Sequence, residues 1–183
     1  HLPYKSWCWI CRAARGYTGA HVHADELSEI AIISADYFFM GESEGPGCIA
    51  ALIVKDCRTK SIIALAVPRK GKDPYVVQRF VQAISFFGYK RCIVRTDQEP
   101  SIVALVDEVR DSWTGELMHE KSPVGDHRAN GWIESGVHTV EAQIRALKIG
   151  VESRYNIVLD HTHSLITRMI CYAGWLVTRY GIG

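Results

Sequence analysis

The chain has 183 residues, of which 48% are hydrophobic and 22% are charged. These proportions are typical of a globular protein with a sizeable buried core and argue against an intrinsically disordered chain. Because the formal net charge is only +1, binding to a nucleic acid would have to depend on local basic patches or on domains outside this sequence.

Three strands are predicted in the first half of the chain, after a segment of 28 residues that shows little periodicity. Apolar runs over 30–41, 48–55 and 61–67 predict β-strands, and short polar turns join them. Three consecutive strands with short connections favour an antiparallel meander. No apolar run approaches the roughly 20 residues that span a bilayer, so we expect no membrane partner.

Helices and strands alternate after the meander. Asp73, which is followed by a proline, is a good N-cap, and Gly88 ends the helix that begins there. A short strand over 91–96 leads to a helix over 100–110 and then to a candidate fifth strand over 116–120.

Two longer helices are predicted toward the C-terminus. The first carries an apolar stripe at spacings of three and four residues from Ile133 to Leu147, with Gly150 as its C-cap. The second covers Leu159–Tyr180. Its predicted buried side consists of Leu165, Met169, Tyr172, Trp175 and Leu176. The order β-β-β-α-β-α-β-α-α predicts an α/β protein whose five-stranded mixed sheet, three antiparallel strands and then alternating helices and strands, is flanked by helices.

Three acidic residues occupy notable places in these elements. Asp36 lies inside an apolar strand, where an unpaired carboxylate is costly to bury. Asp97 lies just beyond a strand end, and Glu134 lies in the predicted first turn of the long helix, at the head of a polar stripe. Three such carboxylates suit hard cations such as Mg²⁺ or Mn²⁺, and two ions can assist phosphoryl transfer. Since the chain has 20 acidic residues, spacing alone does not distinguish these three from solvated surface carboxylates.

Four segments surround these acids: Asp36-Tyr37, Arg95-Thr96-Asp97-Gln98-Glu99, Ser122-Pro123 and Asn130-Gly131-Trp132-Ile133-Glu134. In their order and spacing they resemble the integrase core of retroviruses and retrotransposons, over roughly residues 30–180. The resemblance implies an RNase H-like fold in which Asp36, Asp97 and Glu134 bind two Mg²⁺ or Mn²⁺ ions. It also implies metal-dependent DNA 3′-end processing and strand transfer. The implied partners are the DNA ends of the element, the target DNA and further copies of the chain, bound through the core.

The motifs depart from the usual retroviral pattern beside two of the acids. Gln98-Glu99 follows Asp97 where the family usually has Asn-Gly, and Ser135 follows Glu134 where an arginine is common. Two other functions also stay open, because fold and metal chemistry do not define the substrate. One is another RNase H-like nuclease or transposase, which uses the same metal chemistry; a fourth carboxylate at the site would favour an RNase H. The other is a catalytically silent, integrase-derived domain that only binds nucleic acid or its own kind.

Cys8 and Cys11 form a CxxC pair, which alone is a weak indication of zinc because a zinc site needs four ligands. The resemblance places the pair in the N-terminal HHCC zinc module of integrases. Residues 1–28 are therefore interpreted as the C-terminal remnant of that module and a linker, and residues 29–183 as the catalytic core. Zn²⁺ binding is expected only together with the upstream half of the module. The alternative is a tail with two idle thiols.

Basic and polar residues near the motifs are candidates for DNA contact. Lys70 and Lys72 flank the start of a predicted helix, where a phosphate contact is favourable. His127 and Arg128 lie in the predicted loop beside the site, as does Asn130, which keeps the family's Asn-Gly pattern. Clusters of this size are also typical of an ordinary solvated face.

Both ends of the sequence look cut, so we expect a piece of a longer polypeptide. The sequence has no secretory signal, and its other cysteines are scattered among apolar residues. These features favour a reducing, intracellular compartment. The resemblance implies the nucleus or the nucleoprotein particle of the element as the location.

Overall fold

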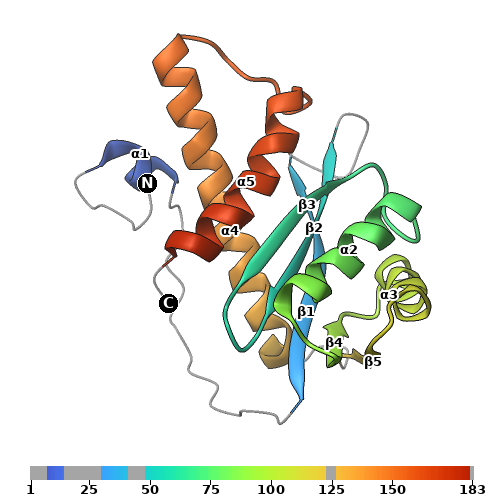
Figure 1. Ribbon diagram of the computed structural model, residues 1–183. Helices are drawn as coiled ribbons and strands as arrows, with labels where there is room; N and C mark the ends of the chain where they lie inside the picture. The colour runs from blue at the N-terminus through green and yellow to red at the C-terminus, as the bar shows by residue number, and fades with distance from the viewer. Residues whose placement is uncertain (1–7, 15–29, 41–47, 123–126, 182–183) are drawn as a thin grey trace.

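A five-stranded mixed sheet forms the centre of the structure, and helices cover both of its faces (Figure 1). The computed structural model describes residues 8–14, 30–40, 48–122 and 127–181, with the backbone alone for 12–14 and 127–130. The strands are β1 (Ala31–Met40), β2 (Ile49–Asp56), β3 (Ile62–Val67), β4 (Arg91–Thr96) and β5 (Glu116–Lys121). The helices are α1 (Trp9–Ala14), α2 (Pro74–Phe87), α3 (Pro100–Ser112), α4 (His127–Tyr155) and α5 (Ser164–Tyr180). The predicted α/β class and mixed sheet are confirmed.

The strand order is β3-β2-β1-β4-β5. β1, β2 and β3 form the predicted antiparallel meander, whereas β4 pairs in parallel with β1 and β5 in parallel with β4. Parallel neighbours need crossover connections, and α2 and α3 lie in these two connections. Asp73 caps α2 by accepting a hydrogen bond from the Tyr75 backbone N–H at 3.0 Å, and Gly88 ends it with φ of 79°. Both ends of α2 are as predicted.

Two apolar cores lie on opposite faces of the sheet. On one face α2 and α3 pack on the strands, and on the other α4 packs on β1 and β2 while α5 packs on β3. β1 contributes to both cores because successive side chains of a strand alternate between faces. Tyr37 lies in the core under α2 and α3, and Phe38 lies in the core under α4 and α5. Asp36 therefore occupies the same face as Phe38, toward α4 and α5.

The buried side of α5 differs from the prediction. The predicted Met169 is buried, but Leu165, Tyr172 and Trp175 are 38%, 51% and 50% exposed. The residues of α5 that are buried are Ile166, Met169, Ile170, Ala173, Gly174 and Val177. A Cβ built on Gly174 would lie 2.7 Å from the Ala64 backbone nitrogen. The helix thus approaches β3 closely at Gly174, where a larger side chain would hold it away from the sheet.

Substitution of Gly174 by alanine should show whether close packing on β3, rather than helix propensity, determines the effect of this residue on stability. We expect Gly174→Ala to lower the free energy of unfolding by about 1–3 kcal/mol, because the methyl group meets backbone atoms of β3. The melting temperature would fall by roughly 3–10 °C. Gly150→Ala is the matched control, since nothing lies within 4 Å of its Cβ position. It should raise stability by up to about 1 kcal/mol. Equal changes in the two thermal melts would contradict this account of α5.

α4 is longer at both ends than predicted. It runs through Gly150 to Tyr155, so Gly150 is not its C-cap. It begins at His127, within the segment predicted to be a loop, so Glu134 lies about two turns inside the helix. Asn130, the last residue of the predicted loop over 122–130, and Gly131 are helical here. Packing of the long apolar stripe against the sheet outweighs their low helix propensity.

One further helix was not predicted. α1 forms within the segment interpreted as a zinc-module remnant and linker, and it packs against α4 (Figure 1). Among the helices that the structure describes, none is both long enough and apolar enough to cross a membrane.

Candidate active site

The first two predicted acids lie where two parallel strands separate. β1 and β4 are in register up to Ser34 and Arg95, and two residues further along each chain stand Asp36 and Asp97. β4 ends at this point, whereas β1 continues along β2. A crevice outside the carboxyl ends of parallel strands is a common place for a ligand site in an α/β sheet. The register of β1 with β4 brings the two aspartates to the edge of such a crevice.

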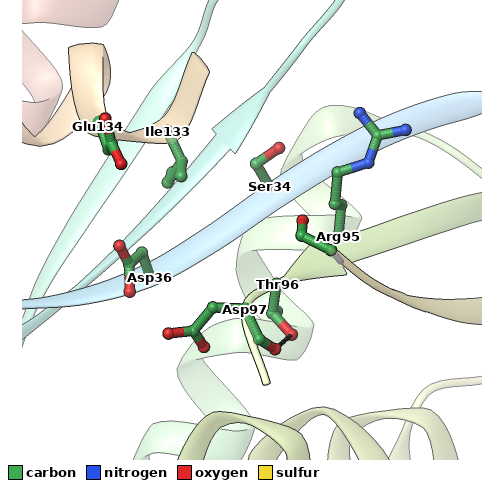
Figure 2. Close-up of a pocket in the computed structure, with 8 residues that line it drawn as sticks. Ser34, Asp36, Arg95, Thr96, Asp97, Ile133 and Glu134 are labelled. Atoms are coloured by element: carbon green, nitrogen blue, oxygen red, sulfur yellow. Dashed lines mark hydrogen bonds between the residues drawn. The ribbon is translucent and has the colours of Figure 1, made fainter. Parts of the chain in front are cut away.

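A cavity of about 150 Å³ opens between this strand edge and α4 (Figure 2). Its lining residues are Ser34, Asp36, Arg95, Thr96, Asp97, Ser122, Ile133 and Glu134. The three predicted acids therefore share one cavity, and they come from β1, from the residue after β4 and from α4. On α4, Ile133 is buried in the core while the next residue, Glu134, is exposed at the cavity.

The carboxylates are not drawn together around a single point in this conformation. Among the residues that the structure describes, no three His, Cys, Asp or Glu side chains are close enough to hold one metal ion. Asp36 and Asp97 interact electrostatically, and Glu134 faces the same cavity from the helix side (Figure 2).

The pKa of Asp36 is higher than that of an ordinary aspartate. Burial raises its pKa from 3.8 to about 6, and the negative charges of Asp97 and Glu99 add to the increase. A hydrogen bond from the Tyr37 backbone N–H to Asp36 Oδ1, at 2.7 Å, and the charge of Lys70 oppose the shift of this pKa. The fold therefore disfavours the charged form of Asp36 relative to an unfolded chain.

Asp36→Asn should stabilise the metal-free protein at neutral pH. A carboxyl whose pKa is raised in the folded state contributes stability below its unfolded pKa and loses it as the pH rises through the folded pKa, here between 3.8 and about 6. We expect a gain of about 2–3 kcal/mol at pH 7.5, which disappears below pH 4. The asparagine keeps the oxygen that accepts from Tyr37. Thermal melts in EDTA at both pH values measure this, and an equal or lower melting temperature at pH 7.5 would refute it.

Hydrogen bonds fix the backbone around Asp97. The Glu99 backbone N–H donates to Asp97 Oδ1 at 3.1 Å, and the Thr96 hydroxyl donates to the Asp97 carbonyl at 2.9 Å. The same hydroxyl lies 2.9 Å from His119 Nε2 and so accepts from it. Burial lowers the pKa of His119, and the neutral ring makes this contact in the tautomer that carries its proton on Nε2. The Gln98 amide donates to a carbonyl after β5 at 3.0 Å. These contacts hold the Asp97 carboxylate at the cavity.

A buried lysine binds the part of α4 that carries Glu134 and holds it against the sheet. Lys55, on β2, donates from Nζ to the Trp132 carbonyl at 2.9 Å, and its ammonium lies 4.3 Å from the indole centroid. Lys60 lies over the same ring at 3.8 Å. Gly136 permits this approach, because a Cβ there would lie 3.0 Å from Lys55 Cδ. Burial lowers the pKa of Lys55 to about 8. Sequence analysis missed this residue, although a lysine inside an apolar strand could have indicated it.

No protein-family model matches this sequence, and no curated protein sequence matches it. Solved structures do match its fold. Two of them are the trimeric and dimeric forms of the HTLV-2 integrase catalytic core domain in complex with magnesium. They are 14% and 15% identical to this chain with TM-scores of 0.56 and 0.55, and each match covers 80% of this chain and 83% of the other. The fold is that of a retroviral integrase catalytic core.

A larger assembly gives the same result. The intasome of simian T-cell lymphotropic virus in complex with PP2A regulatory subunit B56 gamma contains a chain 14% identical to this one, with a TM-score of 0.62. The match covers 96% of this chain and 59% of the other. The RNase H-like integrase fold was thus predicted correctly.

The predicted DNA-contact residues of this integrase-like core fall into two groups. Lys70 forms an ion pair with Glu99 near Asp36, and Lys72 is exposed two residues further along the same connection. The other three, His127, Arg128 and Asn130, belong to the first turn of α4. Their side chains lie outside the described part of the structure.

The predicted zinc half-site lies at the start of α1, against the integrase-like core. Cys8 directly precedes the helix and Cys11 is buried within it. Hydrogen bonds with Cys11 lower the pKa of the Cys8 thiol. Residues 1–7 and 15–29 lie outside the described ranges, so the boundary between residues 28 and 29 stays a prediction.

Proposed function

We propose that this chain is the catalytic core of a DNA integrase, a metal-dependent polynucleotidyl transferase that processes 3′ ends and transfers them to a target DNA. The observation that supports this most is the single cavity lined by Asp36, Asp97 and Glu134. The likeness to integrase cores is one of fold, and a fold alone does not define a reaction. The cavity adds the acidic residues that such a reaction needs, at the crevice of the sheet.

The donor set of the cavity fits Mg²⁺ or Mn²⁺. It offers carboxylate oxygens from three separate elements, and both ions prefer oxygen ligands while keeping several waters. Asp36 and Asp97 would hold the ions, and Glu134 would complete the ligand set from the helix side. Bound ions would polarise the scissile phosphate and stabilise charge on the attacking and leaving oxygens. Two of the similar solved structures are integrase cores in complex with magnesium.

The residues of the chain itself have distinct roles in this proposal. Hydrogen bonds around Asp97 keep its carboxylate oriented, and the partial burial of Asp36 limits the water around it. The basic residues Lys70 and Lys72, together with the first turn of α4, would contact DNA phosphates.

The further proposals concern what surrounds the core. Residues 1–28, with Cys8 and Cys11, would belong to a zinc module that binds Zn²⁺ only with its upstream half. The core would act as a homo-oligomer on the DNA ends of its element and on target DNA, in the nucleus or a nucleoprotein particle.

The test is an assay of DNA nicking and joining. The chain is incubated with a labelled duplex and a DNA carrying a free 3′-hydroxyl, with Mn²⁺ or with EDTA. We expect products in which the 3′-hydroxyl is joined to the duplex, in Mn²⁺ alone and not with Asp36→Asn or Asp97→Asn. Cleavage of only the RNA strand of an RNA–DNA hybrid would favour an RNase H instead. DNA binding without any product at high protein concentration would favour a silent binding domain.

A further inference from the structure

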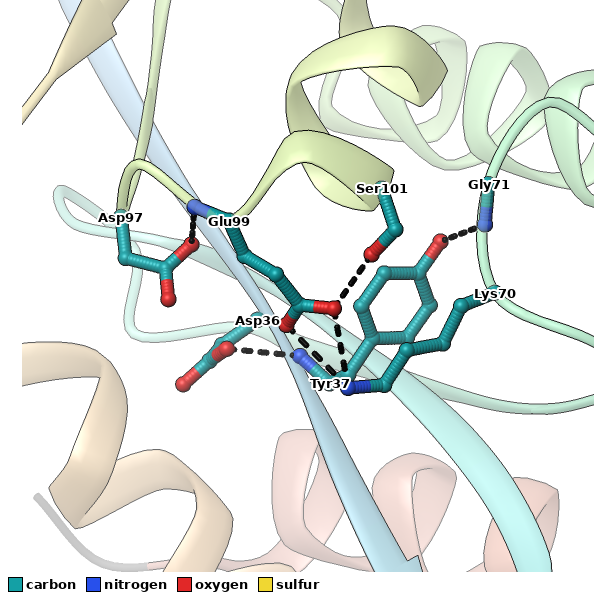
Figure 3. Close-up of polar contacts among 7 residues, drawn as sticks. All are labelled: Asp36, Tyr37, Lys70, Gly71, Asp97, Glu99 and Ser101. Atoms are coloured by element: carbon teal, nitrogen blue, oxygen red, sulfur yellow. Dashed lines mark hydrogen bonds and ion pairs between the residues drawn. The ribbon is translucent and has the colours of Figure 1, made fainter.

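An ion pair between Lys70 and Glu99 lies beside Asp36 and Asp97 (Figure 3). Lys70 lies in the connection between β3 and α2, and its Nζ is 2.9 Å and 3.1 Å from the two carboxylate oxygens of Glu99. Glu99 directly precedes α3, and its backbone N–H binds the Asp97 carboxylate. The two charged side chains remain 23% and 32% exposed. The pair is therefore both accessible and fixed relative to the proposed metal-binding aspartates.

The fold positions the Lys70 ammonium rather than leaving it on a mobile stem. Nζ lies 4.6 Å from the ring centroid of Phe39 and 5.5 Å from that of Tyr37. The next residue, Gly71, has φ of 95°, a conformation that favours glycine, and its backbone N–H donates to the Tyr37 hydroxyl at 3.1 Å. A tight turn and two aromatic rings thus hold the cation above β1, next to the segment that carries Asp36.

The Glu99 carboxylate accepts hydrogen bonds from donors that could equally well bind the oxygens of a phosphate. It accepts from the Lys70 ammonium and from the Ser101 hydroxyl, which is 2.5 Å away. An ion pair that solvent still reaches contributes only about 0–1 kcal/mol of stability. Against this, the Glu99 charge repels that of Asp36. Stability alone is a weak explanation for a further carboxylate beside Asp36 and Asp97.

We propose that Lys70 binds a phosphate of the DNA substrate and that Glu99 holds the same ammonium when DNA is absent. This inference rests on the proposed function, because it takes DNA as the substrate. Carboxylate and phosphate then compete for one cation, and Glu99 weakens DNA binding. The two members of the pair should therefore have opposite effects on DNA affinity, whereas a purely structural salt bridge would give effects of the same sign.

The experiment measures fluorescence anisotropy of a labelled DNA duplex of arbitrary sequence, in EDTA and over a series of NaCl concentrations. Glu99→Gln should tighten binding about 3–10-fold at low salt and steepen the salt dependence by about one phosphate contact. Lys70→Met should weaken binding by a similar factor and flatten the dependence by about one contact. The double variant should match Lys70→Met, because Glu99 acts only through the lysine. Lys70→Arg should retain binding close to that of the unmodified chain.

An exposed ion pair at the far end of the same strands provides the control. Arg91 and Glu116 pair at 3.1 Å at the starts of β4 and β5, the opposite end of these strands from Asp97. Glu116→Gln should leave DNA affinity unchanged, which separates a local effect from a general loss of negative charge. If Glu99→Gln bound DNA no more tightly than the unmodified chain, in a variant whose thermal melt shows an intact fold, the inference would be wrong. If the unmodified chain bound no DNA at any salt concentration, the proposed function would fail as well.

Discussion

Glu134→Gln should reduce metal-dependent DNA joining by several orders of magnitude while leaving DNA binding nearly unchanged. The substitution keeps the volume of the side chain and removes the charge that Glu134 presents to the cavity. Loss of a carboxylate from the ligand set would misplace a cation rather than merely weaken its binding, and the phosphoryl transfer depends on that position. DNA affinity depends mainly on phosphate contacts elsewhere. The measurement is joining of a 3′-hydroxyl end in Mn²⁺, with anisotropy for binding.

Glu141→Gln is the control for this change. Glu141 lies further along the same polar side of α4, where it pairs with His138 at 3.6 Å and with Arg145 at 3.8 Å. Pairs of this kind on a helix surface contribute about 0.3–0.5 kcal/mol, so the variant should join DNA almost as well as the unmodified chain. A joining activity that survives Glu134→Gln, or that is lost with Glu141→Gln, would show that Glu134 is not the third acid.

Mn²⁺ should stabilise the protein, and Asp97→Asn should abolish most of that stabilisation. Neighbouring carboxylates repel one another in the metal-free state, and a cation that binds only the folded chain shifts the unfolding equilibrium. At a concentration 100 times the dissociation constant the gain is about 2.7 kcal/mol, or roughly 5–10 °C in melting temperature. Thermal melts in Mn²⁺ and in EDTA measure it.

Asp111→Asn serves as the control for the metal-linked shift. Asp111 lies on the exposed side of α3, in an ion pair with Arg110 at 3.6 Å. Its variant should keep the full effect of Mn²⁺. An equal shift in the Asp97 and Asp111 variants would mean that Mn²⁺ stabilises the chain at some other place.

Local sequence was enough to predict the elements whose ends are fixed by local chemistry. Asp73 and Gly88 bound α2 because an N-cap carboxylate and a positive φ act within one turn. The buried side of α5 could not be predicted in the same way. There α5 contacts the backbone of β3 at Gly174, because a glycine allows the closest approach. Hydrophobicity had predicted Tyr172 and Trp175 on the buried side, but both are exposed. Packing between elements, rather than the helix itself, decides which face is buried.

The sequence was enough to single out the three acids as candidates, but it did not indicate the groups that surround them. Asp36 stood out because a carboxylate in an apolar strand needs a reason, but its alignment with Asp97 depends on the parallel register of β1 and β4. The contact between Lys55 and Trp132 joins residues 77 positions apart. The contact between Lys70 and Glu99 joins residues 29 positions apart. Only the folded sheet brings these groups together.

If Asp36, Asp97 and Glu134 form one metal site, a bound Mn²⁺ ion should be found among them in a crystal. Crystals of the chain soaked in Mn²⁺ would be examined by anomalous diffraction at the manganese edge. We predict anomalous density in the cavity at the split between β1 and β4, within ligand distance of both the Asp36 and Asp97 carboxylates, with Glu134 turned toward it. Manganese bound elsewhere on the chain, with this cavity empty at saturating Mn²⁺, would contradict the account.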